Sequence, residues 1–411
     1  MKEVGEQGLA GWTIYLDTNN NGQLDLDEIS TTTGLDGKYS FTNLTPGTYT
    51  VSTKTQPNWR ETFPLTGGQG SGTLIAIADR RDLIFDQKRN RLYMTTSDGD
   101  VERYDIATGT LLAPFDVGNS LYGGDITPDG NYLYIAEGQK GATQAFIRKV
   151  NLNDGTVSNL TFNLSYDDLP RDVAFGMNGI GMIKSFGQWG PMRQLNLSND
   201  TIVARNDTGG SVYGGAQIVR SADRSLFFMT EDGISSGDIF TYDATTDKFS
   251  QERRTDAYLG KNLSAVNRNG SLIALEWGTG VSIMDRNLNA VENLNNIDAG
   301  IVFDSTKDIL YGANSSTDEI VAFDTNNWKE LYRFKIGENI ASDYYGHTSA
   351  PYGTGMMSMS DNGQLLFMST PSGVRMFQLE RPGSYTVQLN SSQVVNNINF
   401  GAKALPAEGK T

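Results

Sequence analysis

Between residues 80 and 382, short apolar runs alternate with turns rich in Asp, Asn, Gly, Ser and Thr, and the pattern recurs about every 40 residues. Apolar and polar positions alternate within most runs, which predicts β-strands. Each repeat contains about four such runs, and seven four-stranded repeats predict a seven-bladed β-propeller. We expect the repeats at residues 82–117, 119–165, 166–209, 210–256, 257–297, 298–337 and 338–382.

The seventh repeat contains only three predicted strands, at residues 355–360, 365–368 and 374–379. The apolar run Thr73–Ala78 precedes the first repeat and can supply the missing fourth strand. Such a strand would close the ring and leave no open sheet edge. It would also bring the two ends of the propeller together, which insertion into a loop of another domain requires.

Two flanking segments, residues 11–63 and 383–402, also show strand-like alternation. We interpret them as the two parts of one small β-domain, split by the inserted propeller. The expected all-β organisation is a small β-sandwich at residues 1–66 and 383–403, a seven-bladed propeller at 67–382 and a C-terminal linker at 404–411.

The strand Trp12–Leu16 is followed at once by the twelve-residue loop DTNNNGQLDLDE. Oxygen-bearing residues recur at every second position and a carboxylate ends the loop, which is the spacing of calcium-binding loops. Gly22 stands where the chain must turn sharply. The predicted ligands of Ca²⁺ are Asp17, Asn19, Asn21, the backbone carbonyl of Gln23, Asp25 and Glu28.

Together with this loop, the stretches DGKYSF (36–41), LTPGTYTV (44–51) and residues 383–401 resemble the B-type repeats of serine–aspartate-repeat surface proteins. Those repeats are related to the B-type domains of collagen adhesins. The resemblance implies a small seven-stranded sandwich of a bacterial surface protein, stiffened by calcium. Collagen-adhesin relatives often contain a Lys–Asn isopeptide bond assisted by an acid, but Ser52-Thr53 occupy the place of that acid. We therefore expect calcium rather than an isopeptide bond.

The large repeats resemble the YVTN-type propellers of prokaryotic surface proteins, for example at Ile126–Ile135 and Val101–Gly109. Both resemblances imply an extracellular or cell-surface location in a prokaryote. The fold alone does not determine the function, because propellers serve binding, scaffolding and catalysis.

The composition narrows the classes of partner. The net charge is −15 and Lys and Arg are scattered, so we expect no nucleic-acid partner. No apolar run reaches the roughly 18 residues that a membrane span needs. The chain has no Cys and one His, His347, which excludes disulfides, thiolate metal sites and histidine clusters.

Several aromatic residues are expected on one face of the propeller, with acidic residues between them. Aromatic rings with acidic neighbours suit a sugar, a peptide or a cation, and we expect a protein or glycan ligand. The alternative is that these rings pack between blades and fix the loops. The long loop 338–353 is the strongest candidate, because long loops in compact folds are usually functional. The predicted ligand-binding residues are Tyr122, Tyr166, Trp189, Tyr213, Trp277, Tyr344, Tyr345 and His347.

The sequence contains no nucleophile elbow and no phosphate-binding glycine loop, so we expect a protein that is not an enzyme. The first hypothesis is a surface module whose propeller binds a macromolecule in adhesion, matrix or appendage assembly. A second is a self-assembling repeat unit of a surface layer or filament. A third is a propeller enzyme acting on polysaccharide, using His347 with Tyr344 or Glu276.

Overall fold

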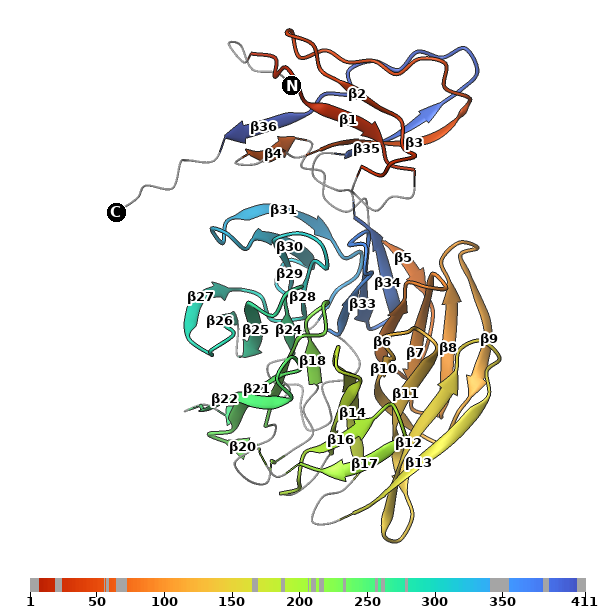
Figure 1. Ribbon diagram of the computed structural model, residues 1–411, viewed down its shortest axis with the longest axis vertical. Coiled ribbons are helices and arrows are strands. Elements are labelled where there is room, and N and C mark those ends of the chain that lie inside the picture. The colour runs from red at the N-terminus through yellow and green to blue at the C-terminus, as the bar shows by residue number, and fades with distance from the viewer. Residues whose placement is uncertain are drawn as a thin grey trace. The chain divides into compact units, whose positions relative to one another are not determined.

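The computed structural model describes the chain from residue 7 to residue 404, with internal gaps. Every regular element among the described residues is a β-strand (Figure 1). The backbone gaps are residues 19–23, 55, 57–58, 64–71, 165–168, 186–188, 206, 208–211, 214–217, 232–233, 256–257, 260–262, 278–279, 341–354 and 380–383. The side chains of residues 60–63, 235, 258–259, 277 and 403–404 are also outside the description.

The chain divides into two compact units. The small unit contains residues 1–69 and 378–411, and the large unit contains residues 70–377. The small unit is therefore assembled from both ends of the chain.

The large unit contains seven four-stranded antiparallel sheets among its described residues, and in six of them the strand order follows the chain order. The first three sheets are β6 (Arg80–Asp86), β7 (Arg91–Thr96), β8 (Asp100–Asp105) and β9 (Thr110–Asp116); β10 (Leu121–Ile126), β11 (Tyr132–Lys140), β12 (Gln144–Asn151) and β13 (Val157–Asn163); and β14 (Pro170–Phe175), β15 (Ile180–Ser185), β16 (Arg193–Asn196) and β17 (Thr201–Ala204).

The next three sheets have the same layout. They are β18 (Ile218–Arg220), β19 (Leu226–Thr230), β21 (Asp238–Asp243) and β22 (Lys248–Arg254); β24 (Ser264–Val266), β25 (Leu272–Trp277), β26 (Gly280–Asp285) and β27 (Ala290–Asn295); and β28 (Ile301–Phe303), β29 (Ile309–Asn314), β30 (Glu319–Asp324) and β31 (Glu330–Lys335). A separate two-stranded sheet pairs β20 (Ile234–Ser235) with β23 (Tyr258–Leu259).

The seventh sheet combines strands from the two ends of the large unit. Its order is β32 (Met357–Met359), β33 (Leu365–Thr370), β34 (Gly373–Gln378) and β5 (Thr73–Ile75). β5 pairs antiparallel with β34, with Ile75 opposite Val374. The strand predicted at Thr73–Ala78 thus occupies the predicted edge of this sheet, although it ends at Ile75.

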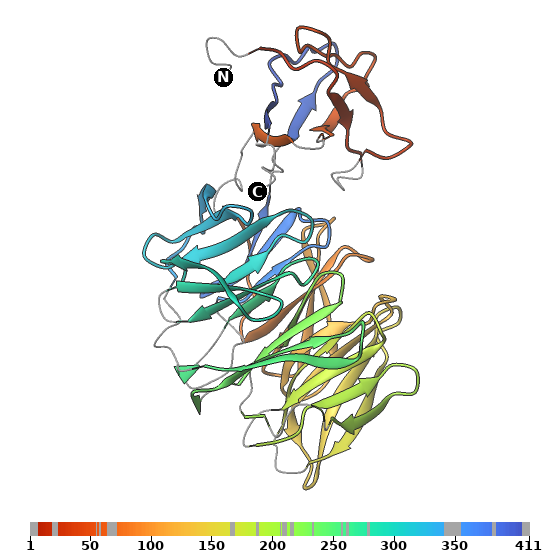
Figure 2. The same ribbon diagram turned by 60° about the vertical axis from the view of Figure 1, so that its left-hand side comes forward.

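The first strands of the seven sheets follow one another in a circuit. Each of β6, β10, β14, β18, β24 and β28 contacts the next, and β32 contacts β6 again. Figures 1 and 2 show these sheets grouped around a common centre, in a propeller-like arrangement. Within the described residues no sheet closes on itself, because the circuit passes through seven separate sheets.

Apolar clusters fill the spaces between adjacent sheets. Phe85 of β6 stacks on Phe367 of β33 with ring centroids 5.5 Å apart, which joins the first sheet to the last. Tyr134 of β11 meets Phe175 of β14 edge to face at 5.0 Å. Such pairs add about 0.5–1.5 kcal/mol to the free energy of burial, so they hold adjacent sheets together.

Buried carboxylates connect neighbouring first strands. Asp82 accepts a hydrogen bond from the backbone N–H of Gly124 in the next sheet (2.9 Å), and Asp172 accepts one from Ile218 (2.7 Å). Glu276 of the fifth sheet accepts one from the N–H of Gly300 (3.0 Å). These carboxylates satisfy backbone groups that sheet pairing leaves open where one sheet meets the next.

The small unit contains one four-stranded and one two-stranded antiparallel sheet. The larger sheet has the order β2 (Ser30–Thr32), β1 (Thr13–Leu16), β3 (Gly47–Thr53) and β35 (Ser384–Leu389), and the smaller pairs β4 (Trp59–Phe63) with β36 (Gly401–Ala404). Both sheets therefore combine strands from the front and rear segments. The described residues form six strands, compared with seven in the family that the sequence resembles, because Tyr39, Phe41 and residues 391–400 lie outside strands.

The core of the small unit is short. Ile14, Leu16 and Val51 are buried, and a layer of partly buried apolar side chains packs on them. That layer consists of Tyr39, Phe41, Leu44, Tyr49, Val387, Ile398 and Phe400. Tyr39, Phe41, Tyr49 and Val51, from the two stretches that carry the family resemblance, thus contribute to this core.

Candidate functional site

The predicted calcium loop begins at the end of β1 in the small unit. The N–H of Leu16 donates to the carbonyl of Ile29 (2.8 Å), and the N–H of Asp17 donates to the carbonyl of Thr50 (2.9 Å). These bonds hold the two ends of the loop side by side. Asp17 is 2% exposed and Glu28 is 8% exposed, so the first and last predicted ligands are both buried.

The Glu28 carboxylate turns back over the loop. Its Oε1 accepts a hydrogen bond from the N–H of Thr18 (2.7 Å), and its Oε2 accepts one from the N–H of Asp25 (3.1 Å). Oε1 also accepts a longer hydrogen bond from the Thr18 hydroxyl (3.3 Å), whereas Oε2 accepts one bond and keeps a lone pair that can face a cation. The hydrogen bonds thereby fix the orientation of the carboxylate at the end of the loop, where calcium-binding loops place a carboxylate ligand.

Three of the six predicted calcium ligands are in the described part of the loop: Asp17, Asp25 and Glu28. Asn19, Asn21 and Gln23 lie outside the described residues. In the described part of the chain, no three acidic or histidine side chains converge as a metal site would require. Two buried carboxylates on one loop nevertheless suit a cation, because burying like charges together is costly without a positive partner.

Among the predicted aromatic residues, Trp189 and Tyr213 come together. Their ring centroids are 5.3 Å apart, and Trp189 is 47% exposed. A short bridge between Gly190 and Val212 holds the two segments against each other. The N–H of Tyr213 donates to the buried Glu231 carboxylate (2.9 Å) and its carbonyl accepts from Lys184 Nζ (3.2 Å). The pair is thus a positioned aromatic surface that remains open to solvent.

Tyr122 has a different environment. It is partly buried, and the guanidinium groups of Arg81 and Arg171 each lie 4.0 Å from the centre of its ring. Cations at both faces leave the ring no free face for a ligand. Tyr122 therefore fits the alternative that these aromatic residues pack between sheets.

The remaining predicted ligand-binding positions lie outside the description. They are Tyr166, Tyr344, Tyr345 and His347, together with the side chain of Trp277. Two of the acidic residues expected near the aromatic face, Glu231 and Glu276, are 3% and 4% exposed. Because both accept backbone hydrogen bonds, their positions indicate a role in fixing loops.

A cavity of about 590 Å³ lies among the first strands of all seven sheets of the large unit. Its walls come from β6, β10, β14, β18, β24, β28 and β32 and from the connections that follow most of these strands. Neither Tyr122 nor the Trp189–Tyr213 pair lines it. The cavity is therefore a different region from the predicted aromatic face.

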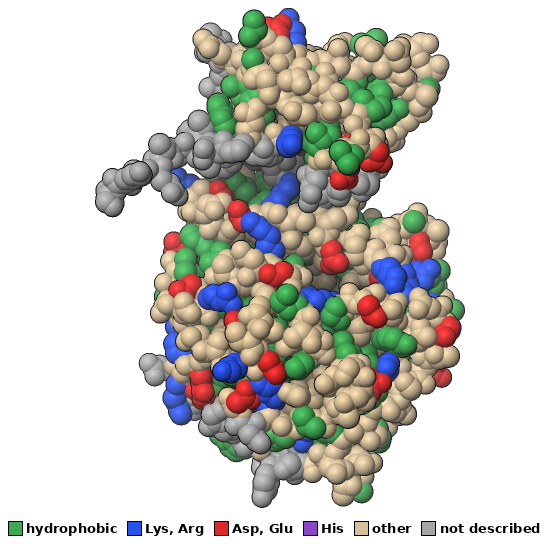
Figure 3. Space-filling view, viewed as in Figure 1, with side chains coloured by type: hydrophobic (Ala, Val, Ile, Leu, Met, Phe, Trp, Pro, Cys, Tyr) green, Lys and Arg blue, Asp and Glu red, His purple; other side chains and the backbone are tan. Residues whose placement is uncertain are grey.

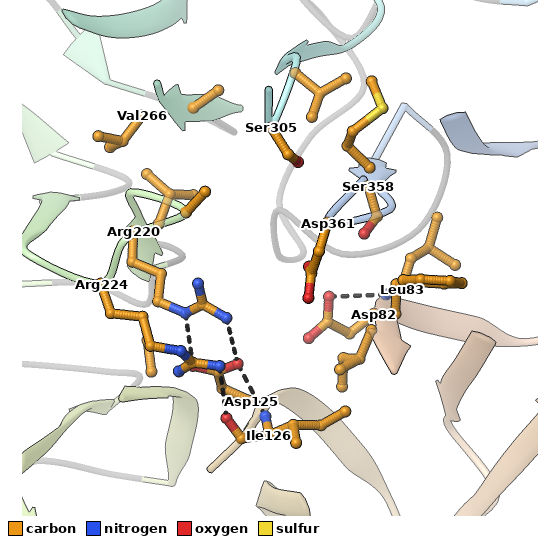
Figure 4. Close-up of a pocket in the computed structure, with 18 of the residues that line it drawn as sticks. Asp82, Leu83, Asp125, Ile126, Arg220, Arg224, Val266, Ser305, Ser358 and Asp361 are labelled. Atoms are coloured by element: carbon orange, nitrogen blue, oxygen red, sulfur yellow. Dashed lines mark hydrogen bonds and ion pairs between the residues drawn. The ribbon is translucent and has the colours of Figure 1, made fainter. Parts of the chain in front are cut away.

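Charged side chains meet across the cavity (Figure 4). Arg220 binds both oxygens of Asp125, through Nε at 2.8 Å and Nη2 at 2.9 Å, and Arg224 Nη1 lies 3.0 Å from Oδ2. Burial by itself would raise the pKa of Asp125, but the two guanidinium groups hold it at about 2. Burial raises the pKa of Asp82, on the neighbouring strand β6, to about 7.

Arg224 has an unusual backbone conformation, with φ at 60°. The equivalent turn position in other sheets is glycine, for example Gly130 and Gly270, both at φ 70°. This left-handed conformation costs a residue with a side chain roughly 1 kcal/mol, whereas glycine adopts it freely. Glycine would adopt this turn more easily than arginine. The presence of arginine therefore indicates that its side chain is needed in the cavity.

Sequence reasoning did not find this cavity. Asp125 is 95 residues from Arg220 along the chain, and only the circuit of sheets brings them together. Asp361 lies in the turn between β32 and β33, and its side chain also reaches the cavity (Figure 4). The one available signal was Arg224 at a turn position where four other repeats have glycine, namely Gly130, Gly179, Gly270 and Gly363.

On the face of the molecule shown in Figure 3, acidic and basic side chains are interspersed rather than separated by sign. Among the described residues, no helix is long and apolar enough to cross a membrane.

Comparison with known proteins supports part of this picture. Residues 1–73 match the family model of the SdrD B-like domain. No curated protein matches the chain. The family match agrees with the resemblance seen at the calcium loop and at residues 36–51. The YVTN-type resemblance has no such support.

Among solved structures, the chain is similar to one titled Kuenenia stuttgartiensis Hydrazine Synthase. The TM-score is 0.56 with 12% sequence identity, and the match covers 75% of this chain and 98% of that one. At this identity the similarity concerns the fold alone.

Proposed function

We propose that this protein is a calcium-binding module of a prokaryotic secreted or cell-surface protein. In this proposal the small unit is a B-type sandwich and the large unit is a seven-bladed propeller inserted into it. The propeller presents a surface that binds a protein or glycan, in adhesion, matrix or surface-appendage assembly. The match of residues 1–73 to the SdrD B-like domain is the observation that carries this proposal.

The calcium part of the proposal rests on the loop at Asp17–Glu28. Asp17 and Glu28 are buried at its two ends, and Glu28 is oriented by Thr18 and Asp25. When bound, Ca²⁺ would neutralise these carboxylates and hold the loop in one conformation. Asp17, Asp25 and Glu28 would be ligands, together with Asn19, Asn21 and Gln23.

Calorimetric titration with Ca²⁺ tests this part directly. We expect saturable binding that is lost in the double variant Asp17→Asn, Glu28→Gln. Asp27→Asn is the matched control, because Asp27 belongs to the same loop but is exposed and is not a predicted ligand. Equal binding by the double variant and the wild type would contradict the assignment of the loop.

The binding part of the proposal rests on the Trp189–Tyr213 pair. An exposed indole held against a second ring suits the apolar face of a sugar or an aliphatic peptide side chain. Binding to a glycan array and to extracellular-matrix proteins should fall at least tenfold in Trp189→Ala. Val203→Ala, which removes a 50% exposed side chain from β17, should bind like the wild type.

Self-assembly and catalysis stay as alternatives that the same samples can distinguish. Calcium-dependent growth of particles in light scattering, without ligand binding, would favour a structural repeat unit. Polysaccharide turnover lost in His347→Ala would favour an enzyme. Since His347 and Tyr344 lie outside the described residues, no observed geometry supports the enzyme.

A further inference from the structure

The cavity of the large unit is a built site rather than a packing defect. Its volume of about 590 Å³ lies within the range of roughly 300–1,000 Å³ of small-molecule pockets. All seven connections between first and second strands are among the described residues, so the turns beside the cavity are defined. The cavity is also formed by one unit alone.

On one wall of the cavity, the charged side chains already have hydrogen-bond partners within the protein. Arg220 uses Nε and Nη2 on Asp125, and its Nη1 donates to the Ser221 carbonyl (3.3 Å). Arg224 donates to Asp125, to the Phe175 carbonyl (3.0 Å) and to the Ile126 carbonyl (2.9 Å). Because these donors have protein acceptors, the two arginines do not require a bound anion.

The opposite wall has open hydrogen-bonding capacity. Figure 4 shows Asp361, Ser305 and Ser358 facing Arg220 across the cavity. Asp361 is exposed to solvent and Ser305 and Ser358 are partly exposed, and their side chains have no hydrogen-bond partner among the described residues. Asp82 accepts one backbone hydrogen bond on each oxygen, from Leu83 (2.8 Å) and Gly124 (2.9 Å), and so retains lone pairs.

The charges of the lining favour a positive ligand. Seven carboxylates and four basic side chains line the cavity among the described residues, which leaves an excess of negative charge. Arg220 and Arg224 neutralise Asp125, whereas desolvation raises the pKa of Asp361 in spite of the two arginines, and Asp82 has no basic side chain bonded to it. A buried carboxylate in this position is stabilised by a cation.

A metal ion fits this wall poorly, because no three acidic or histidine side chains of the described chain are arranged as metal ligands. An organic cation requires less: a carboxylate for its charge, hydroxyl acceptors for its N–H groups and an apolar surface for its carbon chain. Val266 and Met359 also line the cavity and supply that surface.

We propose that the cavity binds a small organic cation, whose ammonium or amidinium group lies at the wall of Asp361 and Asp82. The N–H groups donate to the Asp361 carboxylate and to the hydroxyls of Ser305 and Ser358, and the carbon chain packs against Val266 and Met359. Arg220, Arg224 and Asp125 form the opposite wall as a fixed ion-pair cluster. This inference does not depend on the proposed function of the chain.

Binding should strengthen as the pH rises. A cation favours the ionised form of Asp82, so affinity should increase from about pH 6 to about pH 8, on either side of the pKa near 7. Asp125 stays ionised throughout this range, since its pKa is held at about 2. The charged groups that line the cavity are Asp82, Asp86, Asp125, Asp129, Asp172, Asp304, Asp361, Lys88, Arg220, Arg224 and Arg268.

The test uses three probes of similar length: putrescine (dication), butanediol (neutral) and succinate (dianion). Calorimetry and carboxyl-carbon NMR on the full chain, at physiological ionic strength to screen surface charge, should show saturable binding of putrescine alone. Asp361→Asn should weaken it roughly tenfold or more. This variant should fold, because Asp361 has no hydrogen-bond partner among the described residues.

Asp116→Asn is the matched control, because it removes an exposed carboxylate at the end of β9 and changes the net charge by the same amount. Equal weakening in this control would show general attraction to an acidic protein and overturn the proposal. Saturable binding of succinate without putrescine would overturn it in favour of an anion site. Failure of all three probes to perturb the Asp82 and Asp361 carboxyl signals would also overturn it.

Discussion

Buried carboxylates have different partners in the two units of this protein. In the large unit Asp82, Asp125 and Asp172 are satisfied by backbone N–H groups and, for Asp125, by two arginines. In the small unit Asp17 and Glu28 are buried at the ends of a loop with calcium-type spacing. Asp125 of the large unit thus has its positive partners within the chain, whereas we expect Asp17 and Glu28 of the small unit to take theirs from solution.

The difference follows from the size of each core. The large unit has an apolar cluster at each meeting of two sheets, and its carboxylates sit where those sheets join. The small unit buries Ile14, Leu16 and Val51 with one layer of partly buried side chains around them. Small domains often depend on a metal or another cross-link because they bury too little apolar surface.

The largest effect is expected when Asp125, the carboxylate that pairs with Arg220 and Arg224, is removed. Asp125→Ala leaves two buried guanidinium groups without their carboxylate and should lower the free energy of unfolding of this unit by about 3–5 kcal/mol. Urea denaturation followed by circular dichroism measures it. Asp116→Ala, at an exposed position, should change stability by less than about 0.5 kcal/mol. A similar small change for Asp125→Ala would show that the arginines find other partners.

A second substitution tests how the circuit of sheets is closed. Ile75 of β5 is 2% exposed and belongs to a cluster with Phe367 and Val374, so Ile75→Ala should cost about 2–5 kcal/mol. The neighbouring Leu74 points outward and is 41% exposed, so Leu74→Ala should cost much less. Thermal melts of the two variants provide a comparison within one strand. Equal costs would argue against the observed register of β5 on β34.

The third prediction concerns Ca²⁺, the expected partner of the carboxylates in the small unit. Calcium at a hundred times its dissociation constant should stabilise the small unit by about 2.7 kcal/mol and leave the large unit unchanged. Calorimetric melts in calcium and in EDTA should therefore differ in one transition only. Asp17→Asn with Glu28→Gln should melt alike in both conditions, and Asp27→Asn should retain the difference. If calcium raised the melting temperature of both transitions, its effect would not be specific to the small unit, and the expected difference between the two units would be wrong.

The sequence predicted these strands well because the signals are local. Alternating side chains and turn residues mark β6 to β9 and β28 to β31 closely, and the edge strand β5 could be inferred because the last repeat lacked one. The calcium loop has a fixed spacing within twelve residues, so its ends could also be predicted. Both inferences depend on patterns that a short window of sequence contains.

The cavity could not be predicted in this way. The Asp125–Arg220 pair joins two strands across 95 residues of sequence, and nothing local indicates that they meet. Tyr122 shows the same limit, since its ring lies between Arg81 and Arg171 of the two neighbouring sheets. An aromatic residue at a strand start is therefore insufficient evidence for a binding face until its neighbours in adjacent sheets are known.

The smallest effect concerns the joining of the two chain segments in the small unit. The hydroxyl of Tyr39 donates to the carbonyl of Ile398 (2.8 Å), 359 positions away, and burial raises the pKa of this phenol, so it stays a neutral donor at physiological pH. Tyr39→Phe should retain the ring packing with Phe41 and lose only this bond, at about 1 kcal/mol. The loss should appear in the transition that responds to calcium.

Tyr49→Phe is the matched control, because it removes an exposed hydroxyl that donates to Thr45, four residues away in the same segment (2.7 Å). A bond within one segment and open to water should contribute less than one that joins the front of the chain to its rear. If Tyr39→Phe destabilised the unit no more than Tyr49→Phe, the two segments would be held by strand pairing and apolar packing alone. The small unit would then depend still more on its calcium loop than the comparison with the large unit implies.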